Sequence, residues 1–497
     1  MNIKQAKEEI KNTVKAYLSK NEDGEYCIPP MRQRPLLLIG APGIGKTQIM
    51  EQIARECQIG LVSYTITHHT RQSVVGLPMI AKEEFEGESY SVTEYTMSEI
   101  IASVYRKMRE TGLKEGILFI DEINCVSETL APTMLQFLQC KTFGNQEVPK
   151  GWMIVAAGNP PEYNKSVRDF DMVTLDRVRY MHVEADLGVW RAYARERRIH
   201  SAILSYLELK PNHFYRVEAD VDGLSFVTAR GWEDLSNLMQ TYEKLGIMVN
   251  EEVVAQFLHH KDIAEDAAAY FELYKKYEDD YAISDILAGK VSTYIYARLF
   301  DAAFDERLSV VNLLLAGITG YLNTYTREKK RTDFWYAVLK EYHSKLEKTD
   351  DARALYETII HAQELLLEQA VTEELLTKEE EHARAHLISD IKAAGAAITK
   401  TMSEEEAFSA ARENFEAQRI CFEQQEEQVT AALEHAFSFM EDVFHSGQEM
   451  VVFVTELTIT PDAALFLAEH DIQKYDEYKE KLLIGTRKAA LLEELKK

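Results

Sequence analysis

The stretch "LLLIGAPGIGKTQIM", Leu36 to Met50, constrains the fold more than any other part of the chain. An apolar run leads into a glycine-rich segment that fits the pattern GxxxxGK[ST], and an amphipathic segment, "TQIMEQIARE", follows. This order predicts a strand, a phosphate-binding loop and a helix, because glycines let backbone N–H groups wrap phosphates and a helix N-terminus adds positive potential. The residues predicted to bind the nucleotide are Gly40, Ala41, Pro42, Gly43, Ile44, Gly45, Lys46 and Thr47.

A phosphate-binding loop needs an acidic partner for its metal ion, and the segment "ILFIDEIN" supplies one. Asp121 and Glu122 close its apolar run, and the carboxyl end of a strand in a parallel sheet opens onto the ligand crevice. We therefore predict that Thr47 and Asp121 hold Mg²⁺ and that Lys46 reaches the outer phosphates of ATP. Glu122 is predicted to polarise the attacking water.

A third candidate residue follows the next predicted strand, which runs into "AAGNPPEYN". This order places Asn159 at the same edge of the sheet, where its amide could orient the attacking water or sense the γ-phosphate. The alternative interpretation is turn chemistry, because Asn-Pro commonly begins a turn. The case for function rests on the position of Asn159 one strand after Asp121 and Glu122.

The first third of the chain alternates short apolar runs with amphipathic segments, which is typical of βαβ units and a parallel sheet. The predicted strands are residues 35–40, 60–66, 116–121, 152–158 and 179–184. The segments "VGLPMIAKEEFEGESYSVTEY" and "KTFGNQEVPKGW" predict two hairpins. From about residue 186 the strand pattern fades and helical patterns replace it. We expect an α/β nucleotide-binding core at 1–185, a helical segment at 186–278 and a mainly helical C-terminal domain at 279–497.

The C-terminal part differs in kind from the first third. Residues 401–450 hold twelve Asp or Glu against two Lys or Arg, with apolar residues at helical spacing. This pattern predicts a long amphipathic helix that begins with a capping box from Ser403 to Glu406. Further on, "VVFVTELTITPDAALFLAEH" predicts a short strand and then a helix that is capped by Thr460, with Pro461 in its first turn.

The composition of the chain restricts which binding partners and which cellular compartment the sequence predicts. A net charge of −26 would repel a phosphate backbone unless basic residues were gathered in a channel, so nucleic acid is a disfavoured partner. The five cysteines contain no CxxC pair and fit a reducing compartment. The N-terminus lacks the apolar run of a signal peptide, and the most apolar later run, Leu308 to Leu322, is too short to cross a bilayer. We therefore expect a cytoplasmic protein without membrane insertion.

Several motifs together resemble the AAA+ ATPases and, within them, the MoxR-like group. They are "GAPGIGKT", "VVGLP", "LFIDEIN", "AAGNPPEYN", "LDRVRY" and "TARGWEDL", and the resemblance covers roughly residues 25–275. It implies a P-loop sheet in the strand order 5-1-4-3-2, a helical lid at 186–278 and a ring, usually a homo-hexamer, with nucleotide at each subunit boundary. The two hairpins resemble the inserts of that clade, which face the pore or the axial surface of the ring.

The resemblance also gives roles to arginines. Arg177 in "LDRVRY" resembles the arginine finger that reaches the nucleotide of the neighbouring subunit, with Arg179 as the competing choice. Arg230 in "TARGWEDL" resembles the second sensor, which touches the γ-phosphate from within the same chain. A guanidinium suits the spread charge of a phosphoryl group, and an arginine finger is worth about a thousandfold or more in rate.

These features predict an ATP-hydrolysing remodelling protein in which the lid moves against the core to act on a protein client. MoxR-like proteins resemble chaperones and often act with a partner that carries a von Willebrand factor A domain. Two other functions stay open from the sequence. One is a nucleotide-gated scaffold that hydrolyses little ATP, and the other is the motor of a nucleic-acid restriction or unwinding system. The C-terminal region beyond residue 280 departs from a minimal MoxR-like protein.

Overall fold

The computed structural model describes residues 1–481 except 86–87, 144–145, 164–166, 168–169, 221–222 and 350. The chain divides into two compact units. The first comprises Met1–Val189, Thr228–Arg230 and Leu365–Arg384. The second comprises Trp190–Val227, Gly231–Glu364 and the described residues from Ala385 onward. Both the predicted lid and the C-terminal helices thus lie largely in the second unit, and the division into three domains stays a prediction.

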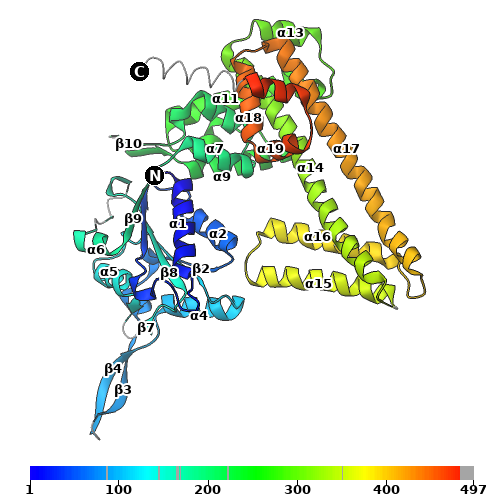
Figure 1. Cartoon of the computed structure of the whole chain (residues 1–497). Helices are drawn as coiled ribbons and strands as arrows, with labels where there is room; N and C mark the ends of the chain where they lie inside the picture. Colours follow the sequence, from blue (N-terminus) through cyan, green and yellow to red (C-terminus); the bar gives the residue numbers. More distant parts are fainter. Residues whose placement is uncertain are drawn as a thin grey trace, which may run out of the picture. The chain divides into compact units, whose positions relative to one another are not determined.

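The first unit is built on a five-stranded parallel sheet in the order β2-β5-β8-β1-β9 (Figure 1). The strands are β1 (Leu36–Gly40), β2 (Gly60–Thr65), β5 (Gly116–Asp121), β8 (Trp152–Gly158) and β9 (Arg179–Val183). All five lie within the predicted runs, and numbering these strands alone along the chain gives the predicted order 5-1-4-3-2. The central strands are buried on both faces, which explains why they read as unbroken apolar runs rather than as an alternation.

Helices cover both faces of this sheet. They are α1 (Ile3–Leu18), α2 (Lys46–Cys57), α3 (Arg71–Val75), α4 (Glu99–Thr111), α5 (Ala131–Cys140) and α6 (Met172–Arg177). On one face, α4 and α5 bury Val104 and Phe137 in the same core as Leu118 and Ile120 of β5. This packing fixes the position of the carboxyl end of β5, where Asp121 and Glu122 lie.

Both predicted hairpins are present in the first unit. The first consists of β3 (Pro78–Phe85) and β4 (Glu88–Tyr95), and the second of β6 (Thr142–Phe143) and β7 (Gln146–Glu147). The connecting residues of each hairpin lie outside the described residues. The first hairpin exposes large apolar side chains, with Ile80 80% and Met79 48% accessible.

The second unit is almost entirely helical. Four of its helices lie partly in the first unit: α7 (Leu187–Glu196) and α9 (Ala229–Leu245) begin there, α15 (Ala352–Thr372) ends there, and α16 (Lys378–Ala394) begins there. The other elements are α8 (Ser201–Leu209), β10 (Arg216–Asp220), β11 (Gly223–Val227), α10 (Glu251–Ala255), α11 (Lys261–Tyr281), α12 (Ile283–Leu287), α13 (Thr293–Phe300), α14 (Phe304–Leu346), α17 (Glu404–Phe444), α18 (Gln448–Ile459) and α19 (Pro461–Glu469). The antiparallel hairpin of β10 and β11 interrupts the helices that the sequence predicted here.

Polar contacts tie the lid helices to the C-terminal helices within this unit. The hydroxyl of Tyr270 in α11 hydrogen-bonds with Ser205 of α8 at 2.6 Å and with Ser309 of α14 at 3.0 Å. Asn312 Nδ2 of α14 donates to Ser205 Oγ at 2.9 Å and to Glu208 Oε2 at 3.2 Å. These half-buried bonds help to join the lid and the C-terminal helices in one compact unit.

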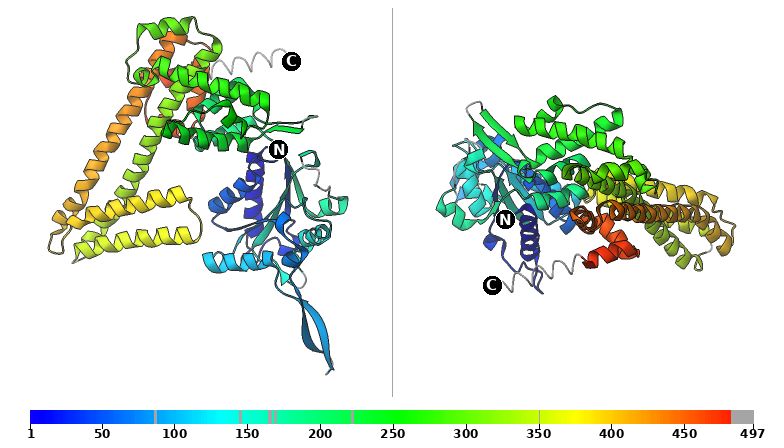
Figure 2. Two further views of the ribbon diagram at one scale, coloured as in Figure 1. Left: turned by 180° about the vertical axis from the view of Figure 1, so that it is seen from behind. Right: turned by 90° about the horizontal axis from the view of Figure 1, so that it is seen from above.

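The two longest helices, α14 and α17, lie side by side in both the front and the rear view (Figures 1 and 2). The capping box predicted at the start of α17 is confirmed, since the side chains of Ser403 and Glu406 each accept a hydrogen bond from the other's backbone N–H. Between the helices, Gln418 Nε2 donates to Glu328 Oε2 at 2.9 Å in a buried contact. The long amphipathic helix is therefore packed along one face, as its apolar spacing predicts.

The short strand predicted at the start of residues 451–470 is wrong, because these residues belong to the helix α18. Its buried residues Met450, Phe453, Val454 and Leu457 follow helical spacing, so packing overrides the β-branched local sequence. The helix after Thr460 is confirmed as α19, although the Thr460 side chain makes no capping hydrogen bond.

No single helix of the described chain is both long and apolar enough to cross a membrane. Only α18 and α19 taken together, bent by 87°, reach the length and composition that such a span would need.

Candidate functional site

The glycine-rich loop joins β1 to α2 and depends on glycine at three positions. Gly43 and Gly45 have φ angles of 72° and 93°, a region that side chains with a Cβ rarely adopt. Gly40 lies so close to β9 that a Cβ would stand 2.4 Å from the backbone oxygen of Val183. Because Gly45 is the N-cap residue of α2, the loop ends at a helix N-terminus, the arrangement that favours binding of phosphate groups.

Lys46, the first residue of α2, is buried within this loop. Its Nζ donates to the backbone oxygens of Gly40 at 2.6 Å and Ala41 at 2.9 Å, and to Asn159 Oδ1 at 2.9 Å. Burial lowers the pKa of Lys46 from 10.5 to about 8, although the charge of Asp121 opposes this shift. The structure thus brings together the predicted lysine, at the start of α2, and the predicted amide, directly after β8.

Thr47 and Asp121 also meet. Thr47 Oγ1 donates to Asp121 Oδ2 at 2.9 Å, across from α2 to the end of β5. A hydroxyl and one carboxylate fit Mg²⁺, which is usually bound through one or two carboxylates together with phosphate oxygens and water. Among the described residues no group of three or more His, Cys, Asp or Glu could hold a metal ion by itself. The donor set therefore suits a nucleotide-bound Mg²⁺ better than a resident metal.

Glu122 is held by a residue that the sequence reasoning missed. Thr67 Oγ1 donates to Glu122 Oε2 at 2.9 Å, and the backbone N–H of Glu122 donates to Asp121 Oδ1 at 2.9 Å. The chain turns sharply here, with a φ of 57° at Glu122. Thr67 comes close because β2 pairs with β5 in a register that sets Thr65 opposite Asp121.

A second missed residue, Asn124, supports the chain at Asn159. Asn124 Nδ2 donates to the backbone oxygen of Asn159 at 2.8 Å. The side chain of Asn124 is almost fully buried, and a Cβ at Gly158 would stand 2.3 Å from its Oδ1. Glycine at 158 thus makes room for Asn124, which fixes the chain that carries the Asn159 amide.

The two candidate finger arginines differ in their surroundings. Arg177 is exposed at the end of α6 and donates to the side-chain oxygen of Gln139. Arg179, two residues later in β9, donates to Thr13 Oγ1 at 2.7 Å and forms an ion pair with Glu9. Arg179 is therefore engaged by α1 of its own chain, whereas Arg177 faces solvent. The choice of Arg177 as the finger stays a prediction.

Arg230 lies against the loop although it belongs to α9. Its backbone N–H donates to the backbone oxygen of Gly43 at 3.2 Å, and a Cβ at Gly43 would stand 3.1 Å from the Thr228 side chain. The positive charge of Arg230 also opposes the charged form of Lys46 and helps to lower the pKa of Lys46. The structure thus brings Arg230 to the nucleotide loop, and its role as a sensor stays a prediction.

The sheet order, the strand, loop and helix at Leu36–Cys57, and the acidic end of β5 together define a P-loop domain with the AAA+ fold. Residues 35–178 match the family model of the AAA domain (dynein-related subfamily). The chain is also similar, at 12% identity and a TM-score of 0.22, to the crystal structure of an ATPase candidate from Cytophaga hutchinsonii ATCC 33406, over 63% of this chain and 74% of that one. No curated protein matches the chain. The resemblance to the MoxR-like group stays a prediction.

Proposed function

We propose that this protein hydrolyses ATP at the boundary between two copies of itself and uses the movement of its lid against its core to remodel or activate a protein client. One observation carries the proposal: Lys46, Asn159, Thr47, Asp121 and Glu122 gather at the carboxyl edge of β5, β8 and β1. These are the groups that a P-loop ATPase needs to hold phosphates, a magnesium ion and an attacking water.

In the proposed reaction, Lys46 and the loop N–H groups hold the phosphates of ATP, while Thr47 and Asp121 hold Mg²⁺. When it is bound, Mg²⁺ neutralises charge on the phosphate oxygens. Glu122 polarises the attacking water and accepts its proton, and Asn159 orients that water. Lys46 already donates to Asn159, so the amide and the ammonium can act on neighbouring oxygens without a large rearrangement.

Arg177 completes the proposed site from the neighbouring subunit. Its exposure, together with the engagement of Arg179 by Glu9 and Thr13, supports this assignment. Phosphoryl transfer spreads charge over the phosphate oxygens, and a guanidinium from the next chain would stabilise that charge only when two copies meet. Arg230 would report the γ-phosphate to the lid from the same chain.

The finer proposal follows the resemblance to MoxR-like proteins. It is a cytoplasmic remodelling ATPase that assembles as a homo-hexamer, with a von Willebrand factor A domain protein as one candidate partner. The apolar side chains that β3 and β4 expose support contact with a protein client. A pulldown from the native cell that never recovers such a partner would count against this part of the proposal alone.

The test is ATP turnover per chain measured against protein concentration, with Glu122→Gln as the inactive control. A rate per chain that rises with concentration and vanishes in Glu122→Gln supports hydrolysis at a site shared between subunits. A rate that stays near zero in both proteins at every concentration would instead favour a nucleotide-gated scaffold.

A further inference from the structure

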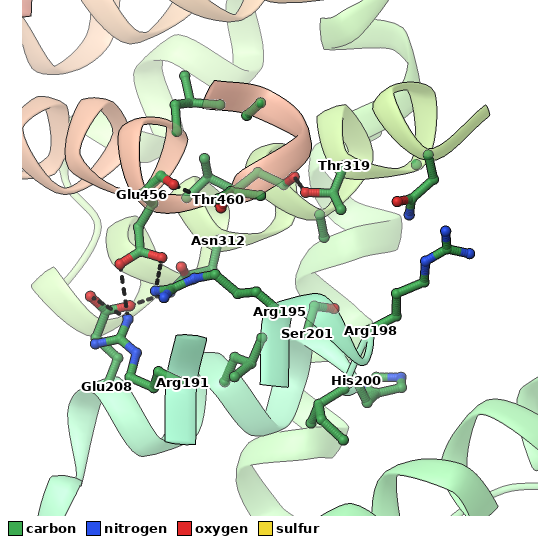
Figure 3. Close-up of a pocket in the computed structure, with 18 of the residues that line it drawn as sticks. Arg191, Arg195, Arg198, His200, Ser201, Glu208, Asn312, Thr319, Glu456 and Thr460 are labelled. Atoms are coloured by element: carbon green, nitrogen blue, oxygen red, sulfur yellow. Dashed lines mark hydrogen bonds and ion pairs between the residues drawn. The ribbon is translucent and has the colours of Figure 1, made fainter. Parts of the chain in front are cut away.

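A cavity of about 320 Å³ lies inside the second unit, between α7, α8 and α9 of the lid and α14, α18 and α19 of the C-terminal helices (Figure 3). None of the candidate nucleotide-site residues lines it. Its volume is at the lower end of the range for small-molecule sites, which runs from about 300 to 1,000 Å³. A cavity of this size fits a small metabolite rather than a peptide segment.

One wall of the cavity carries charges that neutralise each other. Arg191 pairs with Glu456 at 3.1 Å and with Glu208 at 3.4 Å, and Arg195 also pairs with Glu456. Between 10% and 21% of each of these four side chains is accessible. Buried ion pairs rarely stabilise a fold more than apolar residues of the same size would. The stability of the fold therefore gives no evident reason for these four charged side chains to line the cavity.

Arg198 is the third arginine of the lining. Glu243, which also lines the cavity, has its Oε1 3.0 Å from His200 Nε2. Over the part of the chain that the structure describes, the Arg198 guanidinium has no hydrogen bond or ion pair. Figure 3 shows Arg198 across the cavity from Arg191, Arg195 and Glu456. Although the lining holds as many Glu as Arg residues, Arg198, which is exposed, is thus the arginine whose positive charge has no partner among the described residues.

The backbone at Arg198 is unfavourable for an arginine. Ile199 N–H donates to the Ala194 oxygen at 2.8 Å and Arg198 N–H to the Arg195 oxygen at 3.1 Å, which is the pattern of a helix end that usually has glycine at the position of Arg198. The φ angle there is 57°, which costs a residue with a Cβ about 1 kcal/mol or more. Gln240 Nε2 donates to the Arg198 oxygen at 2.6 Å and helps to hold this turn.

The α14 side of the cavity contains a second residue that the fold alone does not favour, the exposed Gly320. Gly320 lies inside α14 and lines the cavity, although glycine in a helix costs about 0.5–1 kcal/mol relative to alanine. A Cβ at Gly320 would meet no atom within 4 Å, whereas a Cβ at Gly317 would stand 2.5 Å from Leu287 Cδ1. Close packing therefore explains Gly317 and leaves Gly320 unexplained.

We propose that this cavity binds a small anion through a carboxylate or phosphate group that pairs with Arg198, while the rest of the ligand lies along Gly320 and Asn323 of α14. A ligand explains both unfavourable choices, since Arg198 supplies its counter-charge and Gly320 leaves room for it. Residues that are locally unfavourable for the fold tend to occur at functional sites, because binding requires them there. The proposal does not depend on ATP hydrolysis.

The test is calorimetric titration of the full-length protein with glutarate and, separately, with inorganic phosphate. A Lys46→Ala background keeps phosphate away from the nucleotide loop, and glutarate is also titrated into the unsubstituted chain in case Lys46→Ala is unstable. Arg198→Gln removes the proposed counter-charge. Arg197→Gln is the matched control, because Arg197 is the preceding exposed residue, lies over the Tyr193 ring and does not line the cavity. Gly320→Leu fills the proposed binding space.

We expect millimolar or tighter binding of at least one anion, weakened about tenfold or more by Arg198→Gln and by Gly320→Leu and unchanged by Arg197→Gln. Binding of glutarate alone assigns a carboxylate ligand, and binding of phosphate alone assigns a phosphate ligand. The proposal is overturned if neither anion binds at millimolar concentration. It is equally overturned if the Arg197 and Arg198 variants weaken binding to the same extent, or if Gly320→Leu has no effect.

Discussion

Replacing Arg177 or Arg179 with alanine should affect different properties of the protein. Arg179 is held by Glu9 and Thr13, but its side chain is 37% accessible and that of Glu9 is 42% accessible. Solvent screens such a pair, so we expect Arg179→Ala to cost about 1 kcal/mol in the free energy of unfolding. For a unit of this size that cost lowers the melting temperature by about 2–4 °C.

Arg177→Ala should leave stability unchanged, because Arg177 is exposed and alanine suits the last turn of α6. As the proposed finger, it should instead lower the ATP turnover number about a thousandfold or more. Arg179→Ala, measured at a temperature where it is folded, should keep most of its activity. Melting curves and turnover at saturating ATP separate the two effects.

Mixing two inactive variants tests whether Arg177 acts between subunits. Arg177→Ala keeps an intact loop and Glu122, whereas Glu122→Gln keeps an intact Arg177. In rings mixed in equal amounts, about a quarter of the boundaries would join the intact half of each variant, so activity should return toward a quarter of the unsubstituted rate. If rings mix and no activity returns, or if Arg177→Ala alone stays fully active, the assignment fails.

Three further predictions follow from individual contacts. Because the pKa of Lys46 is lowered to about 8, kcat/KM for ATP should fall as the pH rises through about 8. Lys46→Arg should keep the positive charge and abolish that fall. An identical pH profile of kcat/KM in both proteins would contradict this role of Lys46. The unfolded chain keeps the proton of Lys46 up to about 10.5, so this residue penalises the folded state below about pH 8 and the penalty is lost as the pH rises. Gln418→Glu would set two carboxylates at the buried contact with Glu328. We expect a lower melting temperature at neutral pH that partly recovers in acid, because the two carboxylates can then share one proton. If the loss of melting temperature did not depend on pH, this explanation would be wrong. Gly116→Ala would place a Cβ 2.6 Å from the backbone oxygen of Gly60, so urea unfolding should show a loss of about 3 kcal/mol or no folded protein, and a loss below 1 kcal/mol would refute the steric argument.

The nucleotide loop and the sheet could be predicted because their signals are local. A strand buried on both faces is a continuous apolar run, and Gly43 and Gly45 mark a loop that only glycine can form. The partners of that loop were harder to predict. Asp121 and Glu122 follow a recognisable strand, but Thr67 acts through the pairing of β2 with β5, which no local pattern encodes.

The C-terminal region shows the limits of local patterns in another way. The capping box at Ser403 and Glu406 marks the start of α17 correctly, because cap and helix are adjacent in sequence. The run at 451–455 suggests a strand, yet its helical spacing of buried residues decides the outcome. The cavity beside Arg198 and Gly320 depends on six helices from three distant stretches of the chain, so it could be found only in the folded chain.

The joining of lid and C-terminal helices in one unit has a mechanical consequence. Asn312, which binds the lid, and Leu346, the last residue of α14, are separated by about 50 Å of continuous helix at about 1.5 Å per residue. A body of this length acts as a lever: each degree by which the lid turns displaces the far end of α14 through an arc of about 0.9 Å. If the lid turned by only a few degrees, the far end of α14 would therefore move by about the distance between adjacent residues along a strand.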